Sequence, residues 1–184
     1  MLDLFCCAGG AAMGYRRAGF DVVGVDIDPQ PRYPFEFHQG DALKFLLEHH
    51  GEFDAFHASP PCQAYTLAQR IQGNDHPDFI AATRSAFELI GKPWVIENVP
   101  GSPLNHPVTY CGASFPGLRV YRHRLFESSI PLTPPTHAEH SAPPHEDGPP
   151  TAGRTLHARR RELHRCTGRA RRDGHPMDDP RRAP

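Results

Sequence analysis

The chain has 184 residues, of which 38% are hydrophobic, and its formal net charge is −1 at pH 7. This length suits one domain with an appendage, and no apolar run approaches the ~20 residues of a membrane-spanning helix. The five cysteines include no CxxC pair, which argues against a disulfide framework and against a structural zinc site. We therefore expect a protein of the reducing cytoplasm with no membrane segment.

The net charge conceals a split along the chain. Residues 1–150 carry 10 Lys and Arg against 17 Asp and Glu, whereas residues 151–184 carry 10 Arg against 4 Asp and Glu. Residues 131–150 hold seven prolines and three histidines and are expected to form a loop or a vestigial target-recognition segment. Residues 151–184 have almost no large apolar side chains and no periodicity, so we expect this Arg-rich tail to be disordered. The compact part is then residues 1–130.

Strands and helices are predicted to alternate within residues 1–130. An apolar strand at 2–5 leads through the small-residue turn Cys7-Ala8-Gly9-Gly10 into a helix at 11–18. A β-branched strand follows at 21–26, and Asp41 is a suitable N-cap for the next helix. A strand at 53–58, an amphipathic helix at 77–90 and a strand at 94–97 complete the series. This alternation predicts right-handed crossovers and a mostly parallel sheet, in the α/β class.

Polar side chains gather where the predicted strands end. Asp26 closes the second strand, Cys62 follows the third, and Glu97 closes the fourth. Ligands of parallel sheets bind beyond the carboxyl ends of the strands, so these positions predict a site. The glycine turn and the helix after it expose free N–H groups, and Asp26 can accept hydrogen bonds from ribose hydroxyls. Together they suggest a nucleoside-containing cofactor, although a purely structural glycine turn remains an alternative.

Cys62 is the sharpest candidate for chemistry. In Ser59-Pro60-Pro61-Cys62-Gln63 the two prolines restrict the backbone, which would hold the thiol rigidly in the cleft as a nucleophile. The alternative is a buried cysteine with a packing role. Glu97 near the same cleft could act as a general acid, or it could be a surface carboxylate in a turn.

Arg122 and Arg124 flank His123 in an apolar stretch. Alternation along a strand would place both guanidinium groups on one face, where they suit a carbonyl oxygen or a phosphate. A solvated edge strand is the alternative interpretation.

In this order, the motifs resemble those of the cytosine-5 DNA methyltransferase family, and the whole stretch looks most like its short bacteriophage and prophage members. The similar segments, in chain order, are Asp3–Gly10 (the motif that binds S-adenosylmethionine), Val25–Asp28, Gly40–Ala42, Pro60–Gln63 (the catalytic motif), Glu97–Val99 and Arg122–Arg124. The resemblance covers about residues 1–130.

The resemblance implies a Rossmann-like S-adenosylmethionine-dependent methyltransferase fold, and methyl transfer to carbon 5 of cytosine in double-stranded DNA by a monomer. Cys62 would form a covalent adduct with a flipped base, Glu97 would protonate ring nitrogen 3, and Arg122 and Arg124 would bind the carbonyl oxygen. Asp26 would bind the ribose, Asp41 the adenine amino group, and Phe5 would line the pocket. The full set implied for the cofactor is Phe5, Cys7, Ala8, Gly9, Gly10, Asp26, Ile27, Asp41, Ala42 and Pro60. No metal is expected.

The sequence departs from the family pattern at three places. Cys7 stands where the first motif usually has glycine, and Val120 stands where a glutamine often precedes the paired arginines. No recognisable last motif follows the short region after residue 130. One hypothesis is that residues 151–184 are read out of frame, and the other is that they form a basic arm that grips phosphates. Two alternative functions stay open: the same chemistry on tRNA, or an inactive remnant that binds cofactor or nucleic acid.

The remaining cysteines and histidines receive simpler interpretations. Cys6 and Cys111 are expected to be core residues. His137, His140 and His145 are expected to be solvated loop histidines, with metal binding as the alternative.

Overall fold

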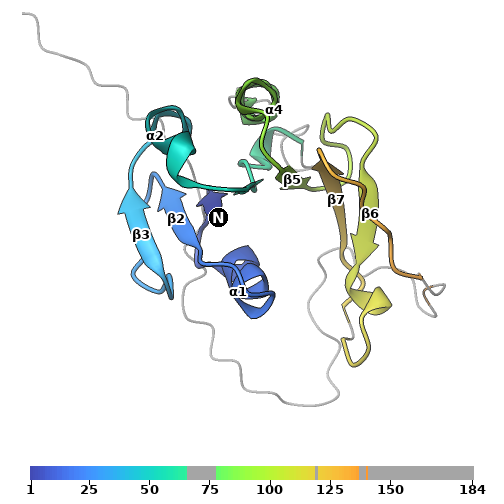
Figure 1. Cartoon of the computed structure of the whole chain (residues 1–184). Helices are drawn as coiled ribbons and strands as arrows, with labels where there is room; N and C mark the ends of the chain where they lie inside the picture. The colour runs from blue at the N-terminus through green and yellow to red at the C-terminus, as the bar shows by residue number, and fades with distance from the viewer. Residues whose placement is uncertain (66–77, 119, 137–139, 141–184) are drawn as a thin grey trace, which may run out of the picture.

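The computed structural model describes residues 1–65, 78–118, 120–136 and 140. They form one seven-stranded sheet with the order β3-β2-β1-β4-β5-β7-β6 (Figure 1). The strands are β1 (Leu2–Leu4), β2 (Val23–Asp26), β3 (Glu36–Gln39), β4 (Phe56–Ala58), β5 (Trp94–Asn98), β6 (Val108–Cys111) and β7 (His123–Ser128). No helix in these ranges is long and apolar enough to span a bilayer.

The sheet is mostly parallel, as the alternation of elements predicts. β1 pairs in parallel with both β2 and β4, and Leu4 lies opposite Val25 and Ala58. β3 and β5 extend this parallel part on either side. The carboxyl ends of the parallel strands therefore meet at one edge, and a Rossmann-like α/β fold is confirmed.

Helices cover both faces of the sheet (Figure 1). α1 (Gly10–Arg17) lies on one face, and α2 (Ala42–His49) and α4 (Phe79–Ile90) lie on the other. Asp41 caps α2, because its Oδ1 accepts a hydrogen bond of 2.9 Å from the Lys44 N–H. Gly91 ends α4 at φ 72°, a left-handed conformation that favours glycine. The predicted N-cap and all three predicted helices are thus confirmed, with ends shifted by one or two residues.

Two apolar clusters hold the layers together. Phe87 of α4 stacks on Phe56 of β4 with ring centroids 5.4 Å apart, and both side chains are fully buried. Burying a side chain of this size stabilises the fold by about 1.5–3 kcal/mol. On the α1 side a smaller cluster contains Cys6 and Tyr33, and a Cβ added at Gly24 would lie 2.3 Å from the Tyr33 ring. Glycine in β2 therefore lets this ring pack directly on the strand.

A buried ion pair joins α4 to β7. The Arg84 Nε and Nη2 atoms donate to the two Glu127 carboxylate oxygens at 2.6 and 2.7 Å. Arg84 also donates to the Pro103 carbonyl oxygen, and Glu127 accepts from the Asn105 N–H. The pair thus fixes the loop before β6 against both elements.

The structure adds strands that the sequence did not predict. β3 is largely exposed and polar, so it lacks the apolar pattern of a buried strand. β6 was not predicted either, and it makes β7 an internal strand between β5 and β6, so the alternative of an edge strand at the paired arginines is wrong. The domain boundaries at residues 130 and 150 stay predictions, and the Arg-rich tail, with both hypotheses about it, lies outside the described residues.

Candidate active site

The Cys62 loop is fixed at the carboxyl edge of the sheet. Ser59 N–H donates to the Leu4 carbonyl oxygen at 3.2 Å, which continues the ladder past β4. The buried Asn98 side chain donates through Nδ2 to the Pro60 carbonyl oxygen at 3.0 Å. Tyr65 N–H donates to the Cys62 carbonyl oxygen at 3.0 Å and closes the 3-10 turn η2 (Gln63–Tyr65). The half-buried, reduced Cys62 thiol is therefore carried by a loop that is tied to β5.

Glu97 lies next to Asn98 on β5 and forms an ion pair with β7. The Arg124 Nε atom is 2.7 Å from Glu97 Oε1, and both side chains are mostly buried. Burial raises the pKa of Glu97, whereas the positive charges of Arg124 and Arg122 and the Ser59 hydroxyl act to lower that pKa. The structure thus brings Glu97, Arg124 and Ser59 together, and Arg122 is near enough to act on the same carboxyl.

A chain of polar side chains reaches Ser59 from α1, and sequence reasoning missed it. The His57 ring lies 3.0 Å from the Tyr15 hydroxyl through Nδ1 and 3.0 Å from the Ser59 hydroxyl through Nε2. Burial lowers the pKa of His57 to about 4, so the ring is neutral and has one donor nitrogen and one acceptor nitrogen. With Ser59 donating to Glu97, the consistent direction has Nε2–H donating to Ser59 and Tyr15 donating to Nδ1. A histidine in the short apolar strand β4 gave no signal of this role.

The loop after β1 has an unusual backbone. Phe5, Cys7 and Gly9 all have positive φ angles, of 56°, 45° and 82°. A side chain in this region costs about 1–2 kcal/mol, which explains why glycine suits the position of Cys7. A Cβ added at Gly9 would lie 2.8 Å from Pro34 Cδ, so Gly9 is required by packing as well as by conformation. Gly10 begins α1.

Asp26 at the end of β2 anchors this loop. Its Oδ2 accepts from the Cys7 N–H at 2.9 Å and its Oδ1 from the Asp28 N–H at 3.1 Å. A carboxylate has about four acceptor positions, so two remain. The Gly40 N–H donates to the Asp26 carbonyl oxygen at 2.9 Å, which sets the N-terminus of α2, with Asp41, beside the end of β2.

Apolar surface accompanies these carboxylates. Ile27 is 54% exposed, and the half-buried Phe5 ring packs against Phe79 at 5.7 Å between centroids. Carboxylate acceptors beside an exposed aliphatic side chain fit the hydroxyls, amino group and base of a nucleoside cofactor. Of the other predicted cofactor residues, Ala8 is exposed, whereas Ala42 packs in the core and Pro60 is buried.

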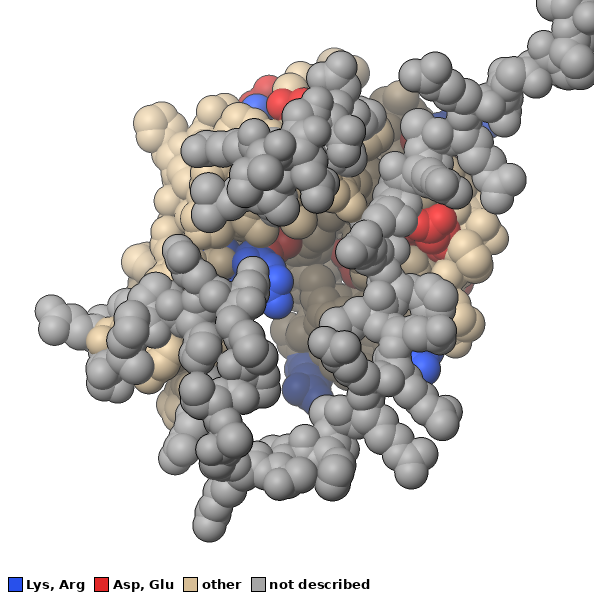
Figure 2. All heavy atoms as spheres, turned by 180° about the vertical axis from the view of Figure 1, so that it is seen from behind, with Lys and Arg blue, Asp and Glu red and all other residues tan. Residues whose placement is uncertain are grey.

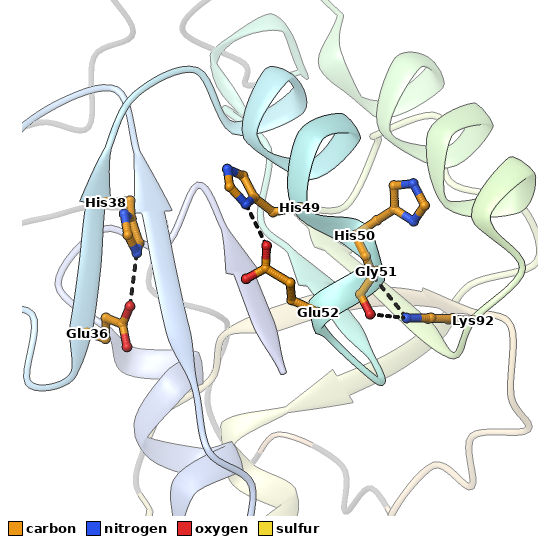
Figure 3. A network of polar contacts seen from close by, with 7 residues as sticks. All are labelled: Glu36, His38, His49, His50, Gly51, Glu52 and Lys92. Atoms are coloured by element: carbon orange, nitrogen blue, oxygen red, sulfur yellow. Dashed lines mark hydrogen bonds and ion pairs between the residues drawn. The ribbon is translucent and has the colours of Figure 1, made fainter.

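A second polar region lies away from this edge (Figure 3). His38 pairs with Glu36 at 3.0 Å on β3, and His49 pairs with Glu52 at 2.8 Å beside η1 (His50–Glu52). Both pairs border a hollow of about 360 Å³ next to α2, and their side chains are well exposed. This hollow contains none of the predicted site residues. Exposed ion pairs of this kind contribute little to the stability of the fold.

Comparison with known proteins relates the chain to one enzyme family. A family model described as C-5 cytosine-specific DNA methylase matches residues 1–102. Type II methyltransferase M.XorII of Xanthomonas oryzae is 31% identical over 118 residues, covering 54% of this chain and 28% of that protein. Type II methyltransferase M.AquIA of Picosynechococcus is 29% identical over 123 residues, covering 55% of this chain and 48% of that protein.

The match to these relatives is partial. The chain spans between about a quarter and a half of their length. Among solved structures, a SAM-dependent methyltransferase from Agrobacterium tumefaciens is similar at 16% identity and a TM-score of 0.45, with coverage of 69% of this chain and 54% of that one. Because the family model covers more than half of its residues, the chain belongs to the C-5 cytosine-specific DNA methylase family.

Proposed function

We propose that the protein transfers a methyl group from S-adenosylmethionine to carbon 5 of cytosine in double-stranded DNA. The observation that supports this proposal is the hydrogen bond between the Cys62 loop and β5. Asn98 holds the Pro60 carbonyl, and the adjacent Glu97 pairs with Arg124, so a hydrogen bond links the loop that carries Cys62 to the strand that carries Glu97.

The Cys62 thiolate attacks carbon 6 of the cytosine ring, and Glu97 delivers a proton to ring nitrogen 3 as the electron pair moves there. When bound, S-adenosylmethionine supplies an electrophilic methyl group for carbon 5. Loss of the carbon-5 proton to water then restores the double bond and expels the Cys62 thiolate, and ring nitrogen 3 returns its proton to the Glu97 carboxylate. The target carbon is inaccessible in a stacked duplex, so the base must be extruded from the helix.

The remaining residues orient the base and the cofactor and stabilise the charge that develops in the reaction. Arg124, with Arg122 beside it, donates to the carbonyl oxygen of the base, where negative charge develops. Asp26 accepts from the ribose hydroxyls, Asp41 accepts from the adenine amino group, and Phe5 lines the pocket. Ile27 offers the apolar contact, and the loop containing Cys7, Ala8, Gly9 and Gly10 presents backbone.

DNA is favoured over tRNA because the matching family model is described as a DNA methylase. Seen from behind, the described part of the surface carries Lys and Arg side chains interspersed with Asp and Glu side chains (Figure 2). The Lys and Arg side chains can attract the phosphate backbone of a nucleic acid. We further propose that the protein acts in the cytoplasm as a monomer.

A trapping experiment tests the function. A duplex containing 5-fluorocytosine has no proton to lose at carbon 5, so the covalent adduct should accumulate when S-adenosylmethionine is present. We expect a denaturant-resistant protein–DNA complex with the unaltered chain and with Cys166→Ser, and none with Cys62→Ser.

Each result has a separate meaning. An adduct that persists in Cys62→Ser removes Cys62 from the mechanism. Transfer of labelled methyl to tRNA but not to DNA would support the RNA alternative. A folded chain that yields neither an adduct nor transfer is the inactive remnant.

A further inference from the structure

Cys111 and His123 form a cross-strand pair beyond the Asn98 end of β5, on the carboxyl side of the sheet. Cys111 ends β6, His123 begins β7, and the two residues lie directly opposite in the antiparallel ladder. Opposed residues on one face have Cβ atoms about 4.5–5.5 Å apart. The Gly112 N–H donates to the Arg122 carbonyl oxygen at 3.3 Å, so the backbone on both sides of the pair is fixed.

His140 joins this pair from the segment that follows β7. Its Nε2 atom lies 3.4 Å from the Cys111 Sγ atom. Its ring stacks on that of His123, with centroids 5.1 Å apart and an interplanar angle of 29°. The sulfur atom and one nitrogen from each imidazole all lie within 4.8 Å of one another.

These distances suit one metal ion. Zn²⁺ takes Cys sulfur at about 2.3 Å and His nitrogen at about 2.0–2.1 Å, so two ligands of a tetrahedral site lie about 3.5 Å apart. The 3.4 Å between Cys111 and His140 already matches this edge. The His123 nitrogen lies within 4.8 Å of both of these atoms, so its ring must come closer to reach the same spacing.

We propose that Cys111, His123 and His140 bind a Zn²⁺ ion. One thiolate and two imidazoles are the ligand types that zinc prefers, and water or another side chain supplies the fourth ligand. Binding releases the Cys111 thiol proton to solvent, and no ligand is oxidised or reduced. Cys111 is 1% exposed, so its sulfur is shielded from bulk water.

The ion would connect three segments at a position close to the proposed active site. His123 stands between Arg122 and Arg124, and the ion would hold the His140 side chain against the start of β7. The proposal does not depend on the methyltransferase activity, because it concerns metal binding alone.

A metal titration of the full-length reduced protein tests the site. After removal of metal with a chelator, Zn²⁺ alone is titrated in competition with a chromophoric chelator, and Co²⁺ is titrated separately. We expect one tight equivalent of Zn²⁺, a rise in melting temperature, and a thiolate-to-cobalt charge-transfer band. Cys111→Ser should abolish the band, and His123→Ala or His140→Ala should weaken Zn²⁺ binding more than tenfold.

Matched controls separate this site from adventitious binding. His38→Ala and His49→Ala remove histidines of the other polar region, and Cys62→Ser removes a different reduced thiol. All three should keep the tight equivalent and the band. If Cys111→Ser does not fold, His140→Ala decides, since His140 lies outside the strands. Unaltered protein that binds Zn²⁺ no more tightly than His140→Ala overturns the proposal and leaves a Cys111–His140 hydrogen bond.

Discussion

Glu97 is subject to opposing influences on its protonation. Burial raises its pKa, and Arg124, Ser59 and Arg122 act in the other direction. In the proposed function Glu97 gives a proton and then carries a negative charge, and a carboxyl whose pKa is raised by burial while nearby cations stabilise its anion suits that role. The sequence suggested Glu97 and Arg124 by motif, but the contribution of Ser59 was visible only once β4 and β5 were paired.

We predict that Ser59→Ala raises the pKa of Glu97, because the mutation removes a hydrogen bond that favours the ionised form. If Glu97 acts as the acid, the high-pH limb of the kcat profile should move to higher pH. Glu97→Gln should remove that limb and slow turnover by about 10²–10⁴-fold. A limb that stays in place in Ser59→Ala would exclude control of Glu97 by Ser59.

At the scale of elements, the N-terminus of α2 has both a structural role and a role in the proposed cofactor site. Its N-cap Asp41 uses Oδ1 to bind the Lys44 N–H and keeps Oδ2 for another donor. The insertion of β7 between β5 and β6 has a similar double effect, because it builds the sheet and sets Arg124 against Glu97. Short-range sequence pattern predicted the cap, since a cap is a local motif. It did not predict the position of β7, which depends on pairing with strands distant in sequence.

We predict that Asp41→Ala lowers the free energy of unfolding by about 1 kcal/mol, because the first turn of α2 loses its cap. Asp41→Asn should keep the cap and hence the stability, since Asn caps helices as well as Asp does. Both variants should bind S-adenosylmethionine more weakly, because neither keeps the carboxylate. Urea unfolding and calorimetric titration measure the two effects separately. Unchanged cofactor affinity in Asp41→Asn would exclude Asp41 from the site.

For the whole molecule, two buried ionisable groups oppose each other in the pH dependence of stability. Burial, with a further contribution from Asp26, raises the pKa of Asp3 from 3.8 to about 7. Burial lowers the pKa of His57 from 6.5 to about 4. As pH rises from about 4 to 7, Asp3 keeps its proton only in the folded state, so its contribution to stability falls. As pH falls from about 6.5 to 4, His57 gains its proton only in the unfolded chain. The contribution of His57 to stability therefore falls as the pH falls.

We therefore predict that these two contributions largely cancel between about pH 4 and 6.5. In Asp3→Asn only the His57 contribution should remain, so the free energy of unfolding should rise with pH by up to about 1.4 kcal/mol per pH unit. In His57→Gln only the Asp3 contribution should remain, so the free energy of unfolding should fall as the pH rises. Urea midpoints measured across this pH range provide the test, and the slope is the quantity to compare because His57→Gln also breaks contacts. Variants that run parallel to the unaltered chain would contradict the prediction.

The sequence by itself determined the alternation of strands and helices, the cap at Asp41 and the motifs around Cys62, Glu97 and Arg124. These features depend on residues close together in the chain, whose spacing reflects local geometry. For His140 the expectation of a solvated loop histidine was wrong, because the ring is half-buried against Cys111.

The tertiary structure alone decided the order of the last strands, the Tyr15–His57–Ser59 chain and the Cys111–His123–His140 cluster. Each joins segments far apart in sequence, and such contacts arise from burial and strand pairing that no local pattern specifies.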